Sequence, residues 1–133
     1  MRPKSVTHRD VFYFITDDPG NKPITVTMYW SPRTPFEVAI KFHETKKRPE
    51  WFIGRQLLTD GLTGEAGGGD ITIRPARDNS WVELHLSSPT GHAGLLMYRH
   101  AITKFLNATY AQTPADRELT PLTDKQLQRL TTY

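Results

Sequence analysis

The residues best equipped for chemistry are two histidines, His85 and His92, separated by a stretch with turn character. If the chain turns at Pro89 and Thr90, the two imidazoles lie diagonally on the outer face of one hairpin, within reach of each other. Imidazole is a common zinc ligand, but two histidines without a third ligand do not make a zinc site. The chain contains no cysteine to complete one. We therefore expect no bound metal and no other cofactor.

Two serines, Ser87 and Ser88, lie beside these histidines in the sequence and raise the alternative of a nucleophile with its base. They adjoin a proline turn, and the sequence does not select between Asp70 and Asp78 as an orienting acid. Glycines 67–69 lack the lysine and serine or threonine of a phosphate-binding loop, and they precede a strand instead of a helix. The sequence thus predicts a protein that is not an enzyme and has no small-molecule substrate.

Positive charge is concentrated in one short run, Lys46, Lys47 and Arg48, with Lys41 nearby. The formal net charge is +3 and the isoelectric point is near 9.3. A mildly basic chain permits an anionic partner without requiring one. We expect a solvated hairpin loop, since such short runs are common on protein surfaces, with a nucleic-acid contact as the alternative.

Three aromatic residues, Phe12, Phe14 and Tyr29, are predicted to lie on the sheet face opposite the core. Exposed aromatics suit base stacking on a nucleic-acid-binding sheet, but they more often mark a subunit interface. The same alternation leaves Leu96 on the outer face of its hairpin. Several apolar side chains outside so small a core favour a homo-oligomer.

The elements that position these residues follow from the alternation of apolar and polar side chains. Residues Ile24–Trp30 and Phe36–Phe42 place apolar side chains at every second position, which is typical of half-buried strands. An earlier strand is expected over Asp10–Thr16, joined to the next by a cluster of turn-forming residues. The sequence therefore predicts antiparallel hairpins.

The segment Trp51–Leu62 is predicted to change from a strand to a short helix. Its first residues are aromatic or β-branched, good helix formers follow, and Gly54 falls at the change. Gly61 stands where a helix needs a left-handed residue to end, so that Leu62 can pack back onto the helix. A helix this short must be held by packing on a sheet.

A second set of strands and a closing helix are expected in the rest of the chain. Residues 64–69 form a flexible, glycine-rich loop in this prediction, and a helix that covers the sheet begins near Tyr98. Strands between them are expected at Ile71–Ile73, Val82–Leu86 and His92–Met97. The result is an α+β fold: an antiparallel sheet of seven to eight strands with one short central helix and one C-terminal helix.

Length and composition suit a single domain. A chain of 133 residues with 37% hydrophobic content can form one core, and we place that domain at residues 1–118 with a tail over 119–133. No segment reaches the roughly 18 apolar residues of a membrane span, and the apolar run Val11–Ile15 is interrupted too early for a signal peptide. We therefore expect a cytoplasmic protein.

Four segments give the chain a resemblance to a known family: WFIGRQLLTDGL (51–62), GGGDITIRP (67–75), LHLSSPTGHA (84–93) and ITKFLNAT (102–109). In this order and spacing, over about Phe36 to Glu118, the chain resembles the SsgA-like proteins of sporulation and cell division from filamentous actinobacteria. The resemblance implies a Whirly-like fold. It implies structural roles for the motif residues Trp51, Arg55, Leu57, Leu58, Gly61, Leu62, Gly69, Asp70, Pro75, Ser88, Pro89, Gly91, Phe105 and Leu106.

The same resemblance implies a non-enzymatic regulator or scaffold of sporulation-type cell division, since some family members help to position the tubulin-like protein FtsZ. It also implies a trimer, recruited from the cytoplasm to the division septum by FtsZ or a septal membrane protein. The alternative is a single-stranded nucleic-acid-binding protein with a Whirly-like fold, supported by the basic run and the exposed aromatics.

Overall fold

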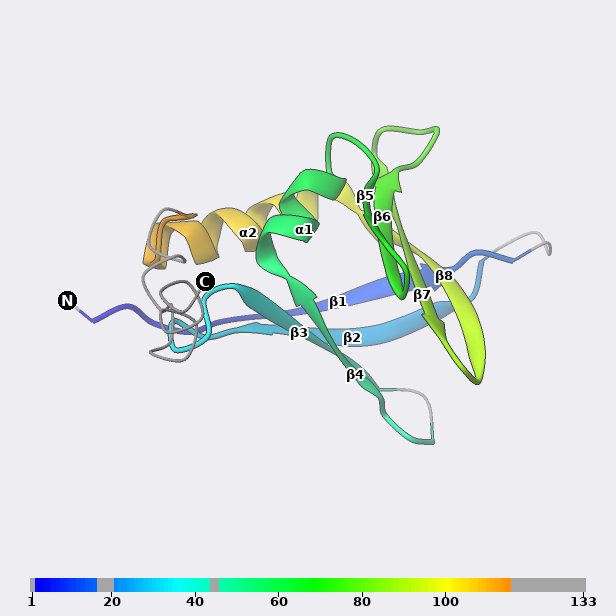
Figure 1. Cartoon of the computed structure of the whole chain (residues 1–133), viewed down its shortest axis with the longest axis horizontal. Helices are drawn as coiled ribbons and strands as arrows, with labels where there is room; N and C mark the ends of the chain where they lie inside the picture. Colours follow the sequence, from blue (N-terminus) through cyan, green and yellow to red (C-terminus); the bar gives the residue numbers. More distant parts are fainter. Residues whose placement is uncertain (1, 17–20, 44–45, 116–133) are drawn as a thin grey trace, which may run out of the picture.

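The computed structural model describes residues 2–16, 21–43 and 46–115 of the chain. These residues form one eight-stranded sheet and two helices, in the order of four strands, a helix, four strands and a helix (Figure 1). Every neighbouring pair of strands is antiparallel. The predicted α+β fold is confirmed. The predicted tail over 119–133 lies outside the described residues.

Strands of the first half are consecutive hairpins with their apolar residues on one face. The predicted alternation is confirmed: Ile24, Val26, Met28 and Trp30 are all buried. The first strand begins before the expected Asp10, and its pairing with the second strand runs along almost its whole length. The bounds are β1 (Val6–Phe14), β2 (Pro23–Trp30), β3 (Glu37–Phe42) and β4 (Glu50–Gly54).

The second half repeats this plan, with one difference from the prediction. Residues expected to form a flexible loop include a short strand, Ala66–Gly68, that pairs with Ile71–Ile73. Gly67 and Gly69 have φ angles of +94° and +71°, which glycine adopts without strain, and this allows the tight hairpin. The bounds are β5 (Ala66–Gly68), β6 (Ile71–Pro75), β7 (Trp81–Ser88) and β8 (Gly91–Tyr98).

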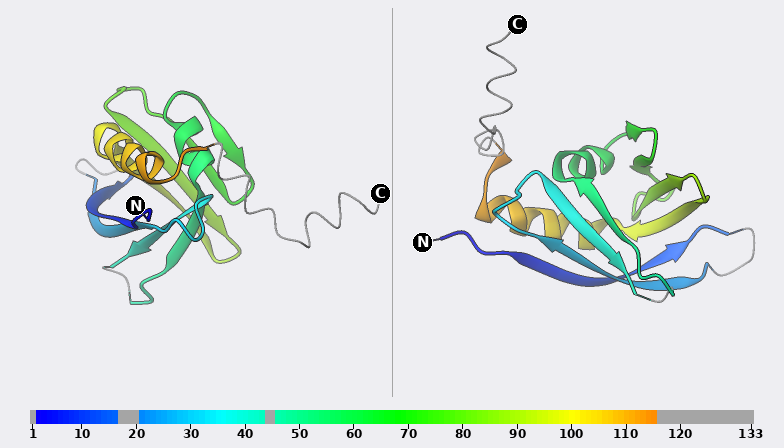
Figure 2. Two further views of the ribbon diagram at one scale, coloured as in Figure 1. Left: turned by 90° about the vertical axis from the view of Figure 1, so that its left-hand side faces the viewer. Right: turned by 60° about the horizontal axis from the view of Figure 1, so that its bottom comes forward.

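The two half-sheets meet at a narrow seam in the middle of the strand order β4-β3-β2-β1-β8-β7-β6-β5. Only two residue pairs, Tyr13 with Leu96 and Phe14 with Leu95, join β1 to β8. The sheet is strongly curled, and α1 (Arg55–Gly61) and α2 (Arg99–Gln112) lie on its concave side (Figure 2). Helix α1 contacts β4, β5 and β6, whereas α2 contacts β1, β8 and α1.

The core fills the space between the helices and the concave face of the sheet. The predicted inner side of the last helix is confirmed, because Ile102, Phe105, Leu106 and Thr109 are buried. Burial of each large apolar side chain stabilises the fold by about 1.5 to 3 kcal/mol. Within the described residues, neither helix combines the length and the hydrophobicity of a membrane-spanning segment.

Gly61 was predicted to end α1 in a left-handed conformation, and this is wrong. Among the described glycines only Gly67 and Gly69 have a positive φ, and Leu62 after the helix has φ −71°. Glycine is needed at position 61 because the backbone of α1 lies against Ile73 of β6, where a Cβ would overlap the Ile73 side chain. Leu62 does pack into the core, as expected.

Candidate functional site

A polar network covers the outer face of β6 and β7. Arg74 donates hydrogen bonds to Glu65 at 3.3 Å and to Glu83 at 3.2 Å. The same Oε1 of Glu83 also accepts a hydrogen bond of 2.8 Å from Nε2 of His85. The side chains of Glu83 and His85 are about one-fifth exposed, at 22% and 21%, so this part of the network is sheltered from solvent.

His85 and His92 meet on the outer face of the β7–β8 hairpin, as the turn at Pro89 predicted. Their ring centroids are 5.5 Å apart, the rings are stacked, and Nδ1 of His85 lies 3.5 Å from Nε2 of His92. Among the described residues no three histidine, aspartate or glutamate side chains are grouped so that they could hold a metal ion. The two imidazoles therefore form a stacked pair on the surface of the hairpin, without the further ligands that a zinc ion requires.

Ser87 is hydrogen bonded to His92, at 3.0 Å between Oγ and Nδ1, but the remaining parts of a hydrolase triad are out of place. The nearest acid, Glu83, contacts His85 instead of His92. His85 in turn contacts His92 only at 3.5 Å, so Glu83 is linked to the imidazole beside Ser87 through a second ring and not directly, as a triad requires. Asp70 contributes only its backbone carbonyl, which accepts a hydrogen bond from Ser87 N.

Glu83 makes the stability of the protein dependent on acid pH. Partial burial raises the pKa of Glu83, but the hydrogen bonds and positive charges of His85 and Arg74 outweigh it, so the pKa lies below its ordinary value of 4.5. A carboxylate with a lowered folded pKa contributes stability that is complete above the unfolded pKa and is lost as the pH falls through the folded pKa. We therefore expect Glu83→Gln to flatten the decrease in unfolding free energy between about pH 5 and pH 3.

Urea unfolding at a series of pH values checks this expectation. Glu65→Gln is the matched control, because Glu65 binds the same arginine but its side chain is 64% exposed. The control should keep the slope of the unaltered protein. Equal slopes for Glu83→Gln and the unaltered protein would contradict the assignment.

The predicted basic run is exposed. Lys46, Lys47 and Arg48 lie in the loop between β3 and β4, and none makes a hydrogen bond or ion pair with any described residue. Lys41 is exposed on β3, where its register partner is Glu50. The expectation of a solvated loop is confirmed, and the loop presents three positive charges at one end of the sheet.

The predicted aromatic face is wrong for Phe12 and Phe14 and correct for Tyr29. Phe12 is fully buried and packs edge-to-face on Phe42, with ring centroids 6.3 Å apart. The register explains this, because Phe12 pairs with Ile24, and residues paired across two strands share a face. Phe14 is half-buried on the same inner face, whereas Tyr29 is 45% exposed on the outer one.

Tyr29 belongs to an apolar row on the outer face. In register with it across β3 and β4 lie Ala39 and Phe52, and Phe52 is 55% exposed. Leu96, predicted to face outward, is half-buried on β8 beside Tyr13 of β1. The outer face therefore carries apolar residues, as expected, but they include Phe52 in place of the predicted Phe12 and Phe14.

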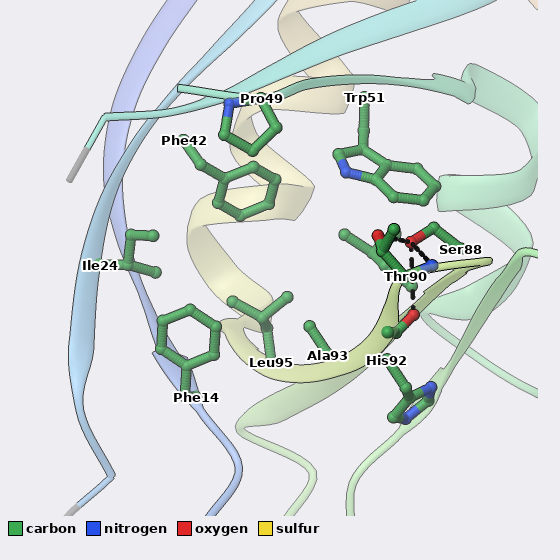
Figure 3. A pocket seen from close by; sticks show the side chains of 12 residues that line it. Phe14, Ile24, Phe42, Pro49, Trp51, Ser88, Thr90, His92, Ala93 and Leu95 are labelled. Atoms are coloured by element: carbon green, nitrogen blue, oxygen red, sulfur yellow. Dashed lines mark hydrogen bonds between the residues drawn. The ribbon is translucent and has the colours of Figure 1, made fainter. Parts of the chain in front are cut away.

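A pocket of about 230 Å³ opens between β4 and the turn that joins β7 to β8 (Figure 3). Trp51 and Pro49 form one wall, Phe14 and Leu95 lie across from them, and the polar side chains Ser88 and Thr90 stand beside Trp51. The sequence did not predict this pocket, because its residues come from six strands and meet only through the curl of the sheet. Its lining consists of Phe14, Ile24, Phe42, Pro49, Trp51, Leu86, Ser88, Thr90, Gly91, His92, Ala93 and Leu95.

Arg55 is fully buried where α1, α2 and the end of β2 meet. From the sequence it is identified only as a helix-forming residue, and its burial is not predicted. Its guanidinium carbon lies 4.1 Å from the centre of the Tyr110 ring and 5.2 Å from that of Trp30. Nη1 donates a hydrogen bond of 3.4 Å to Thr109. The sequence did contain a sign of this burial, because Arg55 stands between the apolar residues 51–53 and the pair Leu57 and Leu58.

The remaining motif residues divide into core and turn positions. Trp51 lines the pocket, and Pro75 is half-buried at the end of β6. Those in or against the core are Leu57, Leu58, Gly61, Leu62, Phe105 and Leu106. Those exposed at hairpin turns are Gly69, Asp70, Ser88, Pro89 and Gly91.

Comparison with protein families gives a match over most of the chain. The family model described as Streptomyces sporulation and cell division protein, SsgA, matches residues 24–118. The sporulation-specific cell division protein SsgB of Saccharopolyspora erythraea is 36% identical over 135 residues, covering 98% of this chain and 96% of the relative. SsgB of Streptomyces coelicolor is 30% identical over 107 residues, covering 78% of each chain.

Two solved structures have the same fold. One is a structure of SsgB from Streptomyces coelicolor, in which mutations correlate with longitudinal cell division during sporulation; it matches with a TM-score of 0.82 and 27% identity, over 90% of this chain and 97% of the other. The other is an SsgA-like sporulation-specific cell division protein from Thermobifida fusca, with a TM-score of 0.80 and 28% identity, over 100% of this chain and 98% of the other.

Proposed function

This chain belongs to the SsgA family of sporulation and cell division proteins, and on that premise we propose that it is a non-enzymatic regulator that acts as a scaffold in sporulation-type cell division. The observation that carries the proposal is the 36% identity to an SsgB protein over 98% of the chain. Similarity of fold alone does not define function, whereas identity along nearly the whole sequence supports a shared role.

The geometry of the polar residues supports a role without catalysis. Ser87, His92 and Glu83 do not have the geometry of a triad, because the carboxylate contacts His85 and reaches His92 only through the 3.5 Å contact between the two imidazoles. The pocket on the other face has an apolar floor and contains no charged side chain. The chain presents surfaces suited to contacts with other macromolecules: an apolar row, a basic loop and a pocket.

As partners we propose FtsZ or a septal membrane protein, which would recruit the protein from the cytoplasm to the division septum. The test is sedimentation of the purified protein with FtsZ polymers, beside a titration with single-stranded DNA. We expect binding to FtsZ and only weak attraction to DNA, abolished by salt, because a few exposed cations gain affinity mainly through counterion release.

Two variants identify the cause of any DNA binding. Replacing Lys46, Lys47 and Arg48 with alanine should remove the weak attraction. Tyr29→Ala should leave it unchanged, whereas stacking of a base on this ring would be worth about 1 to 3 kcal/mol. Tight, salt-resistant binding to DNA that depends on Tyr29, with no binding to FtsZ, would contradict the scaffold and establish the nucleic-acid alternative.

We further propose that the protein is a homo-oligomer, a trimer. Tyr29 and Phe52 support this, because both are exposed on the outer face, on either side of the buried Ala39, and exposed apolar surface on a small domain favours association. Gel filtration with light scattering measures the mass. A monomer at micromolar concentration would contradict the proposal.

A further inference from the structure

We propose that the pocket between β4 and the β7–β8 turn binds a partner segment in which one large apolar side chain is flanked by acidic residues. The apolar side chain would enter the pocket, and the acidic residues would contact Lys46, Lys47 and Arg48. The inference rests on the proposed function in one respect, since a scaffold requires a surface that captures a partner. It adds the position of that surface and the chemistry of the segment.

The size of the pocket indicates a side chain as its occupant. Sites for small molecules and cofactors usually have volumes of about 300 to 1,000 Å³. The pocket measures about 230 Å³, below that range. A buried cavity of about 150 Å³ is known to accept benzene, so this pocket has room for a phenylalanine or leucine side chain.

The lining of the pocket is matched to an apolar group. Its floor consists of Ile24, Phe42, Leu86 and Leu95, each no more than 4% exposed. The indole of Trp51 is half-buried and stands at the side of the opening (Figure 3). A side chain that enters would exchange water for contact with these residues, which is the main source of affinity at apolar sites.

Positive charge next to the opening of the pocket favours a partner segment whose flanking residues are acidic. Pro49 lines the pocket, and it directly follows Lys46, Lys47 and Arg48 in the chain. The three cations are exposed and unpaired with described residues, so they are available to carboxylates of a bound segment. Complementary charge of this kind accelerates association and excludes basic segments.

The polar groups at the rim argue against a nucleobase as the occupant. A base has donors and acceptors on its edges that need partners when buried. In this pocket Ser88 is already hydrogen bonded to Thr90, at 3.0 Å (Figure 3). His92 is hydrogen bonded to Ser87, also at 3.0 Å. A phenylalanine or leucine makes no such demand. The peptide is therefore the better match, although both ligands would bring negative charge.

The test is a titration of the ¹⁵N-labelled protein, followed by NMR, with three nine-residue peptides. The first has a central phenylalanine among glutamates, the second has alanine in its place, and the third has lysines in place of the glutamates. We expect the first to shift the resonances of Gly91, Ala93 and the Trp51 indole. It should bind about tenfold or more tightly than the second, as expected for burial of one large apolar side chain.

Two variants locate the binding. Ala93 lines the pocket, and Ala93→Leu fills it, so binding of the first peptide should fall about tenfold or more. Phe52 follows Trp51 in the chain but lies on the outer face of the sheet, away from the pocket, so Phe52→Ala should leave binding unchanged. Circular dichroism and thermal unfolding establish that both variants are folded.

Several results would overturn the proposal. They are the absence of shifts at Gly91 and Ala93 with the first peptide at millimolar concentration, equal affinity for the first two peptides, and unchanged affinity in Ala93→Leu. Stronger binding of a nine-residue oligothymidine at the same resonances would assign the pocket to nucleic acid instead. The titration contains no division protein, so its failure is distinguishable from a failure of the protein to bind FtsZ.

Discussion

Replacement of Arg55 with alanine is expected to lower the free energy of unfolding by roughly 3 kcal/mol or more, because it empties a buried junction. The guanidinium lies between the rings of Tyr110 and Trp30 and donates a hydrogen bond to Thr109. A desolvated cation over an aromatic ring gains about 2 kcal/mol, and truncation also leaves a cavity between three elements. Thermal unfolding should show a midpoint lowered by roughly 10 °C.

Two further substitutions separate packing from charge. Arg55→Met keeps most of the side-chain volume and removes the charge, so it should recover part of the loss. Arg55→Lys keeps the charge but lacks the flat group that contacts both Tyr110 and Trp30, so it should remain clearly less stable than the unaltered protein. If Arg55→Ala unfolded within a few degrees of the unaltered protein, the junction would not depend on this side chain.

The second large effect is expected from Gly61→Ala. In a helix alanine is ordinarily more favourable than glycine by about 1 kcal/mol, so the change should stabilise α1 if only helix propensity mattered. The new Cβ would overlap the side chain of Ile73 and lie 3.3 Å from its backbone carbon. Ile73 is fully buried in the sheet and cannot withdraw. We expect a net loss of about 2 to 3 kcal/mol in unfolding free energy, measured in urea.

Gly64→Ala is the matched control for this prediction. Gly64 lies three residues further along the chain, and a Cβ there would meet nothing within 4 Å. It should change the free energy of unfolding by less than about 1 kcal/mol. A Gly61→Ala protein as stable as Gly64→Ala would show that α1 does not lie as close to β6 as described.

Local patterns predicted most of the fold because they depend on neighbouring residues. Alternation from Ile24 to Trp30 requires one buried face, and the change of residue type at Gly54 fixes where a strand becomes a helix. Gly61 was misread because two requirements, a left-handed turn and a close contact, both select glycine. Only the position of Ile73, distant in the sequence, shows which requirement applies.

The candidate site was less predictable because it depends on register and curvature. The prediction that His85 and His92 lie close together is correct, because a single tight turn between them determines which residues of the hairpin are neighbours. Phe12 was assigned to the wrong face, because the inner face of β1 is defined by its pairing with Ile24 and not by its own alternation. The pocket lined by Trp51 and Ala93 joins residues from both half-sheets, which no local pattern brings together.

The narrow seam between β1 and β8 has a consequence for how the chain folds. Within each half every strand pairs with its neighbour in sequence, so these contacts close short loops that form rapidly. The pairs Tyr13–Leu96 and Phe14–Leu95 instead join distant parts of the chain and require the largest loop closure of any strand pairing in the sheet. Folding should therefore be limited by the docking of two preformed meanders. Substitutions at the seam should slow folding more than those of similar cost in the outer hairpins.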